Sequence, residues 1–255
     1  MEKKRKKHTF LIITACFLAL AVIQTLPIFF YAPLGSKTMV GSNIILSYQP
    51  GDEKGANEVF SLLTKKSDEI YTKMNFTSTI PTKVYLYKTR SQLAIREAGF
   101  ITLAIAPLWH IGDSHNGNIM MVSPYAPVKV HTHDDILNAT LHELVHSIVF
   151  QINPKLSYFW DNGLATYLAQ QKFNIDISTM AVPTIKQMHT ENGLEFGEIG
   201  GYAFSYNYID YLEKKYGWDK IVTYASGNGS YEDVFGKSEK EIYDEWCQYL
   251  NGRDN

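Results

Sequence analysis

The chain has 255 residues, of which 45% are hydrophobic and 13% aromatic, which is enough apolar material for the core of one domain of ordinary size. Its formal net charge of −2 conceals an asymmetry, because residues 2–7 carry a net charge of +4, residues 8–31 carry none, and the remainder carries −6. The two cysteines, Cys16 in an apolar run and Cys247 near the C-terminus, exclude a fold held together by disulfides, and an acidic remainder without a basic stripe argues against nucleic acid as a partner.

The N-terminus combines a basic tip with an apolar run over residues 9–31. About twenty helical residues span the hydrocarbon core of a bilayer, and the positive-inside rule places the tip in the cytoplasm. A cleaved signal peptide using Ala19-Leu20-Ala21, or a lipoprotein signal using Cys16, would leave about ten further apolar residues where a polar mature N-terminus is expected. We therefore expect residues 1–31 to form a cytoplasmic tip and an uncleaved single-pass anchor in the cell membrane, with the rest of the chain extracytoplasmic.

The next part of the chain predicts a small sheet with a helix packed on it. Residues 32–43 are rich in glycine and serine and are expected to form a linker. Residues 44–48 and 84–87 have the β-branched and aromatic composition of strands, and residues 56–74 repeat apolar side chains at helical spacing. A short helix is expected at residues 91–98.

A hairpin is predicted by Asn116-Gly117, which lies between two β-like runs. Prolines follow its second strand, residues 119–123, so we expect that strand at the edge of the sheet. His131 and His133 then form an H-x-H pair, a pattern that can bind metal. A helix N-terminus capped by Thr132 or its acidic neighbours explains the segment better.

A helix expected over residues 135–152 carries His142-Glu143-Leu144-Val145-His146. Residues four apart share one face of a helix, so both imidazoles can reach one metal ion, and Glu143 is turned about 100° to the side. Two ordinary, partly buried histidines would need no such glutamate. The pattern is that of a zinc hydrolase, with His142 and His146 as Zn²⁺ ligands and Glu143 as the base for a water molecule.

Downstream, Phe159-Trp160-Asp161-Asn162-Gly163-Leu164-Ala165-Thr166-Tyr167 begins another helix, and here the chain resembles the gluzincin metallopeptidases with peptidase-MA-like domains. In that family HExxH is followed by W-x-x-E-G-x-A-x-Y, whose glutamate is the third zinc ligand. The resemblance extends through a tyrosine-rich helix over residues 202–216. It implies a zincin-like α+β fold over residues 44–250, with an active-site helix, a helical C-terminal half and a cleft that takes a peptide or protein substrate.

The position of the family's ligand glutamate holds Asn162, whose neutral carbonyl oxygen is a poorer ligand for Zn²⁺ than a carboxylate. Four explanations stay open. Asn162 coordinates weakly, or Asp161 replaces it, or an acid comes across a loop from Glu191, Glu195 or Glu198. In the fourth, the domain is a catalytically impaired gluzincin-fold binding or scaffold domain.

The resemblance also implies a tyrosine near the start of the tyrosine-rich helix that stabilises the oxyanion of a tetrahedral intermediate. Tyr202 is the candidate and Tyr206 the alternative. The sequence thus predicts a membrane-anchored, extracytoplasmic zinc peptidase in which Glu143 activates the water and residues 119–123 align the substrate by strand addition.

Overall fold

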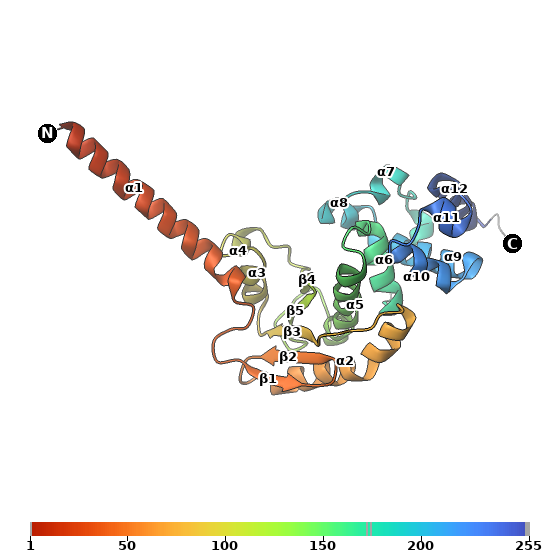
Figure 1. Ribbon diagram of the computed structural model, residues 1–255, viewed down its shortest axis with the longest axis horizontal. Helices are drawn as coiled ribbons and strands as arrows, with labels where there is room; N and C mark the ends of the chain where they lie inside the picture. The colour runs from red at the N-terminus through yellow and green to blue at the C-terminus, as the bar shows by residue number, and fades with distance from the viewer. Residues whose placement is uncertain (1, 172, 174, 253–255) are drawn as a thin grey trace.

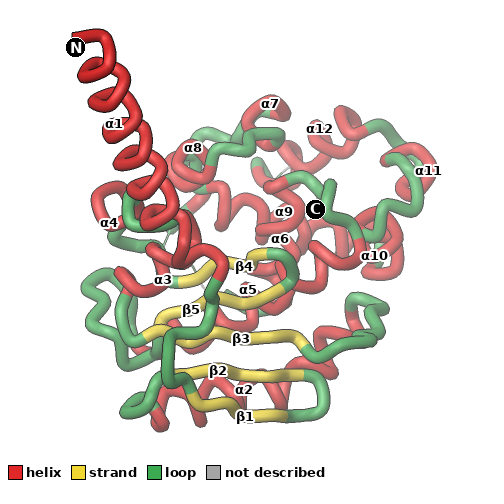
Figure 2. The backbone as a smooth tube through the Cα atoms, turned by 60° about the vertical axis from the view of Figure 1, so that its left-hand side comes forward, coloured by secondary structure: helices red, strands yellow, loops and turns green. Residues whose placement is uncertain are grey.

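A computed structural model describes residues 2–171, 173 and 175–252, and it places a five-stranded sheet beside a group of helices (Figures 1 and 2). The strand order is β1-β2-β3-β5-β4. The central strands are parallel, and the strand at each edge is antiparallel to its neighbour. The strands are Lys37–Val40 (β1), Ile44–Tyr48 (β2), Thr82–Tyr87 (β3), Gly112–His115 (β4) and Asn118–Val122 (β5). The expected α+β fold with a small mixed sheet is therefore confirmed.

Two expectations about the strands are wrong. The segment expected as a linker contains β1, whose Met39 lies opposite Leu46 of β2, so the folded domain begins before residue 44. The hairpin strand expected at the edge is instead the interior strand β5, between β3 and β4. Its residues Ile119 to Val122 are fully buried, because β5 pairs with a strand on each side. The prolines follow the strand, so they end it and do not interrupt its pairing. The edge belongs to β4, the short polar half of the hairpin.

Two long helices cover the sheet side by side, namely Glu53–Lys73 (α2) on β2 and His133–Ile152 (α5) on β4 and β5. Arg90–Ala98 (α3) also packs against β3, β4 and β5, and it is followed by the short helix Thr102–Ile105 (α4). The helix over residues 135–152 is confirmed, and it begins two residues early because Thr132 and Asp135 form a capping box.

The C-terminal half is helical, as expected, and packs around Gly201–Tyr216 (α9). Its closest partner is Tyr158–Leu168 (α6). Gly163 makes this approach possible, because a Cβ atom there would lie 2.9 Å from the Ser205 carbonyl oxygen. The remaining helices are Ile177–Thr179 (η2, 3-10), Ile185–Met188 (α7), Gly193–Glu198 (α8), Trp218–Ala225 (α10), Tyr231–Phe235 (α11) and Glu239–Leu250 (α12).

The N-terminal helix Glu2–Thr25 (α1), continued by the 3-10 helix Leu26–Phe29 (η1), projects from the domain (Figure 1). Within the described residues, Arg5–Phe29 is the one helical stretch long and apolar enough to cross a membrane, and none of its most apolar window is buried. A signal sequence near the N-terminus also meets these criteria of length and apolar composition.

Candidate metal centre

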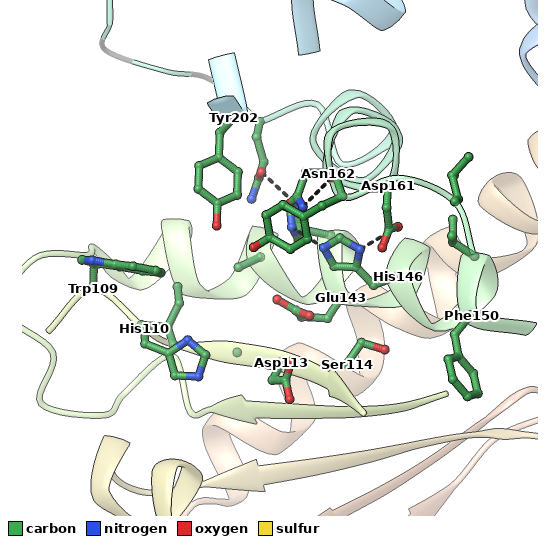
Figure 3. Close-up of a pocket in the computed structure, with 18 of the residues that line it drawn as sticks. Trp109, His110, Asp113, Ser114, Glu143, His146, Phe150, Asp161, Asn162 and Tyr202 are labelled. Carbon is green, nitrogen blue, oxygen red and sulfur yellow. Dashed lines mark hydrogen bonds and ion pairs between the residues drawn. The ribbon is translucent and has the colours of Figure 1, made fainter. Parts of the chain in front are cut away.

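The two histidines of the HExxH motif lie on one face of α5, as their spacing predicts. Their Nε2 atoms face each other at 2.8 Å. The opposite ring nitrogens are engaged elsewhere: His142 Nδ1 lies 3.0 Å from Gln171 Oε1, and His146 Nδ1 lies 2.8 Å from Asp161 Oδ1. Both imidazoles therefore direct the same atom, Nε2, to one point, while the two side chains behind them fix the ring orientation. Figure 3 shows Asp161 beside the ring of His146.

The proton positions follow from these contacts. Gln171 Oε1 only accepts hydrogen bonds, so His142 carries its proton on Nδ1 and presents a lone pair at Nε2. Burial, together with the neighbouring His146, lowers the pKa of His142 well below its usual value. Burial also acts to lower the pKa of His146, but the Asp161 carboxylate outweighs it and raises that pKa to about 9. His146 is thus the more basic of the two rings, because the Asp161 carboxylate lies against its Nδ1 edge.

Glu143 lies beside the histidines and is only 8% exposed. Burial raises the pKa of its carboxyl group to about 7, with Asp113 adding to the rise and His146 opposing it. The backbone of β4 passes close by, because a Cβ atom at Gly112 would lie 3.0 Å from Glu143 Oε1. A carboxyl group with a pKa near neutrality can both take and return a proton, which is the property that a general base requires.

The candidates for a third ligand lie in different places around the two histidines. Asn162 is buried and lines the cavity, and its Nδ2 donates a hydrogen bond to the Tyr158 carbonyl oxygen at 2.9 Å. The amide oxygen is therefore the atom of Asn162 that is left to bind a metal ion. Asp161 contacts the ring edge of His146 that faces away from Nε2, so it lies behind the ring and not at the point to which the two Nε2 atoms converge. The described residues contain no group of three His, Cys, Asp or Glu side chains arranged to hold one metal ion.

The three loop acids are excluded as ligands by their positions. Glu191, Glu195 and Glu198 are exposed, and the cavity wall includes none of them. Glu195 instead accepts a hydrogen bond from the Thr190 hydroxyl. The side chains present therefore meet part of what a metal ion needs. Two imidazole nitrogens converge on one point, and the third protein ligand would have to be the Asn162 amide oxygen.

Tyr202 reaches the site from the start of α9, as expected. Its ring centroid lies 6.3 Å from that of His142, and its side chain lines the cavity. Burial and the neighbouring Tyr158 raise the pKa of its hydroxyl group, so Tyr202 stays a proton donor at neutral pH. The alternative, Tyr206, contacts Tyr167 and Phe173 and does not itself line the cavity.

These side chains line a cavity of about 460 Å³ between α5, α6, β4 and the start of α9 (Figure 3). The two histidines of the H-x-H pair lie in different surroundings. His131 lines the cavity and contacts the Trp109 carbonyl oxygen at 2.8 Å, whereas His133 contacts Glu58 at 2.7 Å. The capping role expected of Thr132 is confirmed.

Four side chains of the site were missed by the sequence reasoning. Asp113 and His110 come from β4 and the loop before it, Gln171 follows α6, and Tyr158 begins α6. None belongs to a local motif, because each reaches the site only through the packing of distant elements. Only the place of Asp113 on the first strand of the predicted hairpin could have indicated a position near the active-site helix.

No known protein-family model matches this chain. No curated protein matches it either.

Proposed function

We propose that this protein is a membrane-anchored, extracytoplasmic zinc-dependent peptidase with a zincin-like fold. The observation that carries the proposal is the convergence of His142 and His146 Nε2 at 2.8 Å beside the buried carboxyl group of Glu143, in a cavity. His142, His146 and the Asn162 oxygen would hold the ion, and Asp161 and Gln171 would fix the two rings. Bound Zn²⁺ supplies Lewis-acid chemistry, which polarises a carbonyl group and acidifies a water molecule.

The protein's own residues then divide the proton transfers. Glu143 takes a proton from the attacking water and delivers it to the leaving amine, a role that its pKa of about 7 supports. Tyr202, protonated because burial raises its pKa, donates a hydrogen bond to the oxygen that becomes negative. The free edge of β4, with Gly112 and Asp113 on the cavity wall, aligns the substrate backbone by strand addition, in place of the interior strand β5.

The membrane part of the proposal rests on α1. Its apolar stretch Arg5–Phe29 is exposed and follows a basic tip, which favours an uncleaved anchor with a cytoplasmic N-terminus.

Asn162 supports a second candidate function, a binding or scaffold domain that has lost catalysis. The described residues place no carboxylate at the point to which the two histidines converge. An amide oxygen holds Zn²⁺ less tightly than a carboxylate does.

The test compares the wild-type protein with Glu143→Gln on a mixture of unstructured peptides, in the presence of zinc. We expect wild-type hydrolysis to be abolished in the variant while its zinc content stays the same, because Gln keeps the shape of the side chain but cannot accept the proton. Equal hydrolysis by both proteins would refute the mechanism. A wild-type protein that neither hydrolyses peptides nor retains zinc would favour the scaffold function.

A further inference from the structure

The segment of residues 100–109, which includes the short helix α4 and is called the apolar loop below, exposes its large side chains. Six of them are between 42% and 69% exposed, namely Phe100, Ile101, Leu103, Ile105, Leu108 and Trp109. The loop contains no charged residue. Scattered exposed apolar side chains are normal on a protein surface, but six within ten consecutive residues form the kind of continuous apolar surface that marks an interaction site.

The apolar loop is held in place by partly buried polar contacts. The Arg90 guanidinium donates to the carbonyl oxygens of His110, at 3.2 Å, and of Pro107. Backbone hydrogen bonds from Ala106 to Thr102 and from His110 to Pro107 close its two turns. These backbone groups are thus paired within the protein, while the large apolar side chains are exposed. This arrangement is what a segment in contact with lipid needs, since lipid offers no hydrogen bonds.

The apolar loop also lies beside the end of α1, where that helix meets the domain (Figures 1 and 2). Gln24 connects the two: its Nε2 donates to the Ala98 carbonyl oxygen, and its Oε1 accepts from the Ile101 amide, each at 3.0 Å. The helix continues past this point with Leu26 and Phe29, both more than half exposed. The apolar surface of α1 is therefore continuous with that of the loop.

From this continuity we infer that the apolar loop rests in the interfacial layer of the bilayer that α1 spans. The exposed side chains would enter the boundary between headgroups and acyl chains, with Trp109 at the headgroup level. The inference rests on the proposed anchor and not on the proposed hydrolysis.

This contact has a consequence for the cavity, because Trp109 belongs both to the apolar loop and to the cavity wall, followed there by His110 and Ile111. A loop fixed at the membrane holds the cavity mouth close to the lipid surface. The substrates that it favours are then polypeptide segments lying at or emerging from the membrane, rather than peptides free in solution.

The experiment places single fluorescent labels on the full-length protein, in a Cys16→Ser, Cys247→Ser background. One label is attached at Ile105→Cys in the apolar loop. The matched control is Ile80→Cys, because Ile80 is equally exposed at 69% and precedes β3, at the opposite end of the sheet from α3. A third label at Leu18→Cys reports on α1 itself.

The proteins are reconstituted into vesicles of phosphatidylcholine and phosphatidylglycerol containing lipids with a nitroxide near the headgroup or in the acyl chain, and iodide serves as the aqueous quencher. We expect several-fold stronger lipid quenching at position 105 than at position 80, and the reverse order with iodide. Equal quenching at positions 105 and 80, while position 18 is quenched by acyl-chain nitroxide, would overturn the inference and leave the anchor intact.

Protection of position 105 from iodide without lipid quenching would mean that a protein covers the loop, and would also overturn the inference. Absence of lipid quenching at position 18 would refute the anchor, and the inference with it. No step of this measurement depends on catalysis, so its failure is distinct from a failure of the proposed hydrolysis.

Discussion

Replacement of Asp161 by Asn should weaken zinc binding without removing it. Asp161 Oδ1 lies 2.8 Å from His146 Nδ1, on the far side of the ring from the Nε2 that would bind the ion. The amide of Asn has the same shape as the carboxylate but no charge, so the ring keeps its neighbour and loses the ion pair that makes it a stronger ligand. A partner of this kind contributes about 10- to 100-fold in metal affinity, which corresponds to about 1.4 to 2.7 kcal/mol.

The measurement is competition for zinc between the full-length protein and a chromophoric chelator. Asp113→Asn is the matched control, because this carboxylate also lines the cavity but acts on His146 only through its electrostatic field. We expect the control to lose markedly less affinity than Asp161→Asn. Equal losses in the two variants, or an unchanged affinity in Asp161→Asn, would refute the role of Asp161 as a positioning residue. A loss far above 100-fold would mean that Asp161 is itself a ligand.

The other predictions concern the third ligand, the packing behind it and the C-terminal helices. Asn162→Glu should tighten zinc binding by more than about tenfold in the same competition assay, because a carboxylate replaces an amide oxygen, and an affinity no better than that of the wild type would count against Asn162 as a ligand. Gly163→Ala should lower the free energy of unfolding by about 1–3 kcal/mol in urea titrations, because its Cβ would lie 2.9 Å from the Ser205 carbonyl oxygen. Gly197→Ala, with open space around its Cβ, should be neutral or slightly stabilising, and a comparable loss there would contradict the packing argument. Burial acts to raise the pKa of Glu245, but hydrogen bonds from two lysines and a tyrosine hold that pKa at about 2. The wild type should therefore be more stable than Glu245→Gln at pH 6, and this difference in the free energy of unfolding should disappear as the pH falls from about 5 to 2. A difference that does not depend on pH would contradict the prediction.

The sequence was most informative where one short segment determines its own structure. The capping box at Thr132 and the spacing of His142 and His146 are local, and the start of α5 and the shared face of the two rings follow from them. The α+β class was predictable for the same reason, since strand-like and helix-like patterns in the chain can be read one segment at a time.

Features that depend on contacts between distant segments were not predictable. A strand inside a sheet and one at its edge can have the same composition. The sequence therefore predicts β5 at the edge, whereas β4 pairs with its outer side. β1 looks like a linker in the sequence because Gly-Ser pairs flank its four residues, and only its pairing with β2 makes it a strand. The contact of Asp161 with His146 depends on the packing of α6 against α5, which no local pattern records.

The central claim is that His142 and His146 together hold a zinc ion, and elemental analysis tests it most directly. The full-length protein and its His146→Ala variant are purified under zinc-replete conditions, and their zinc content is measured after dialysis. The convergence of the two Nε2 atoms predicts stoichiometric zinc in the wild type and its loss in the variant. Zinc that is absent from the wild type, or equal in the two proteins, would contradict the account.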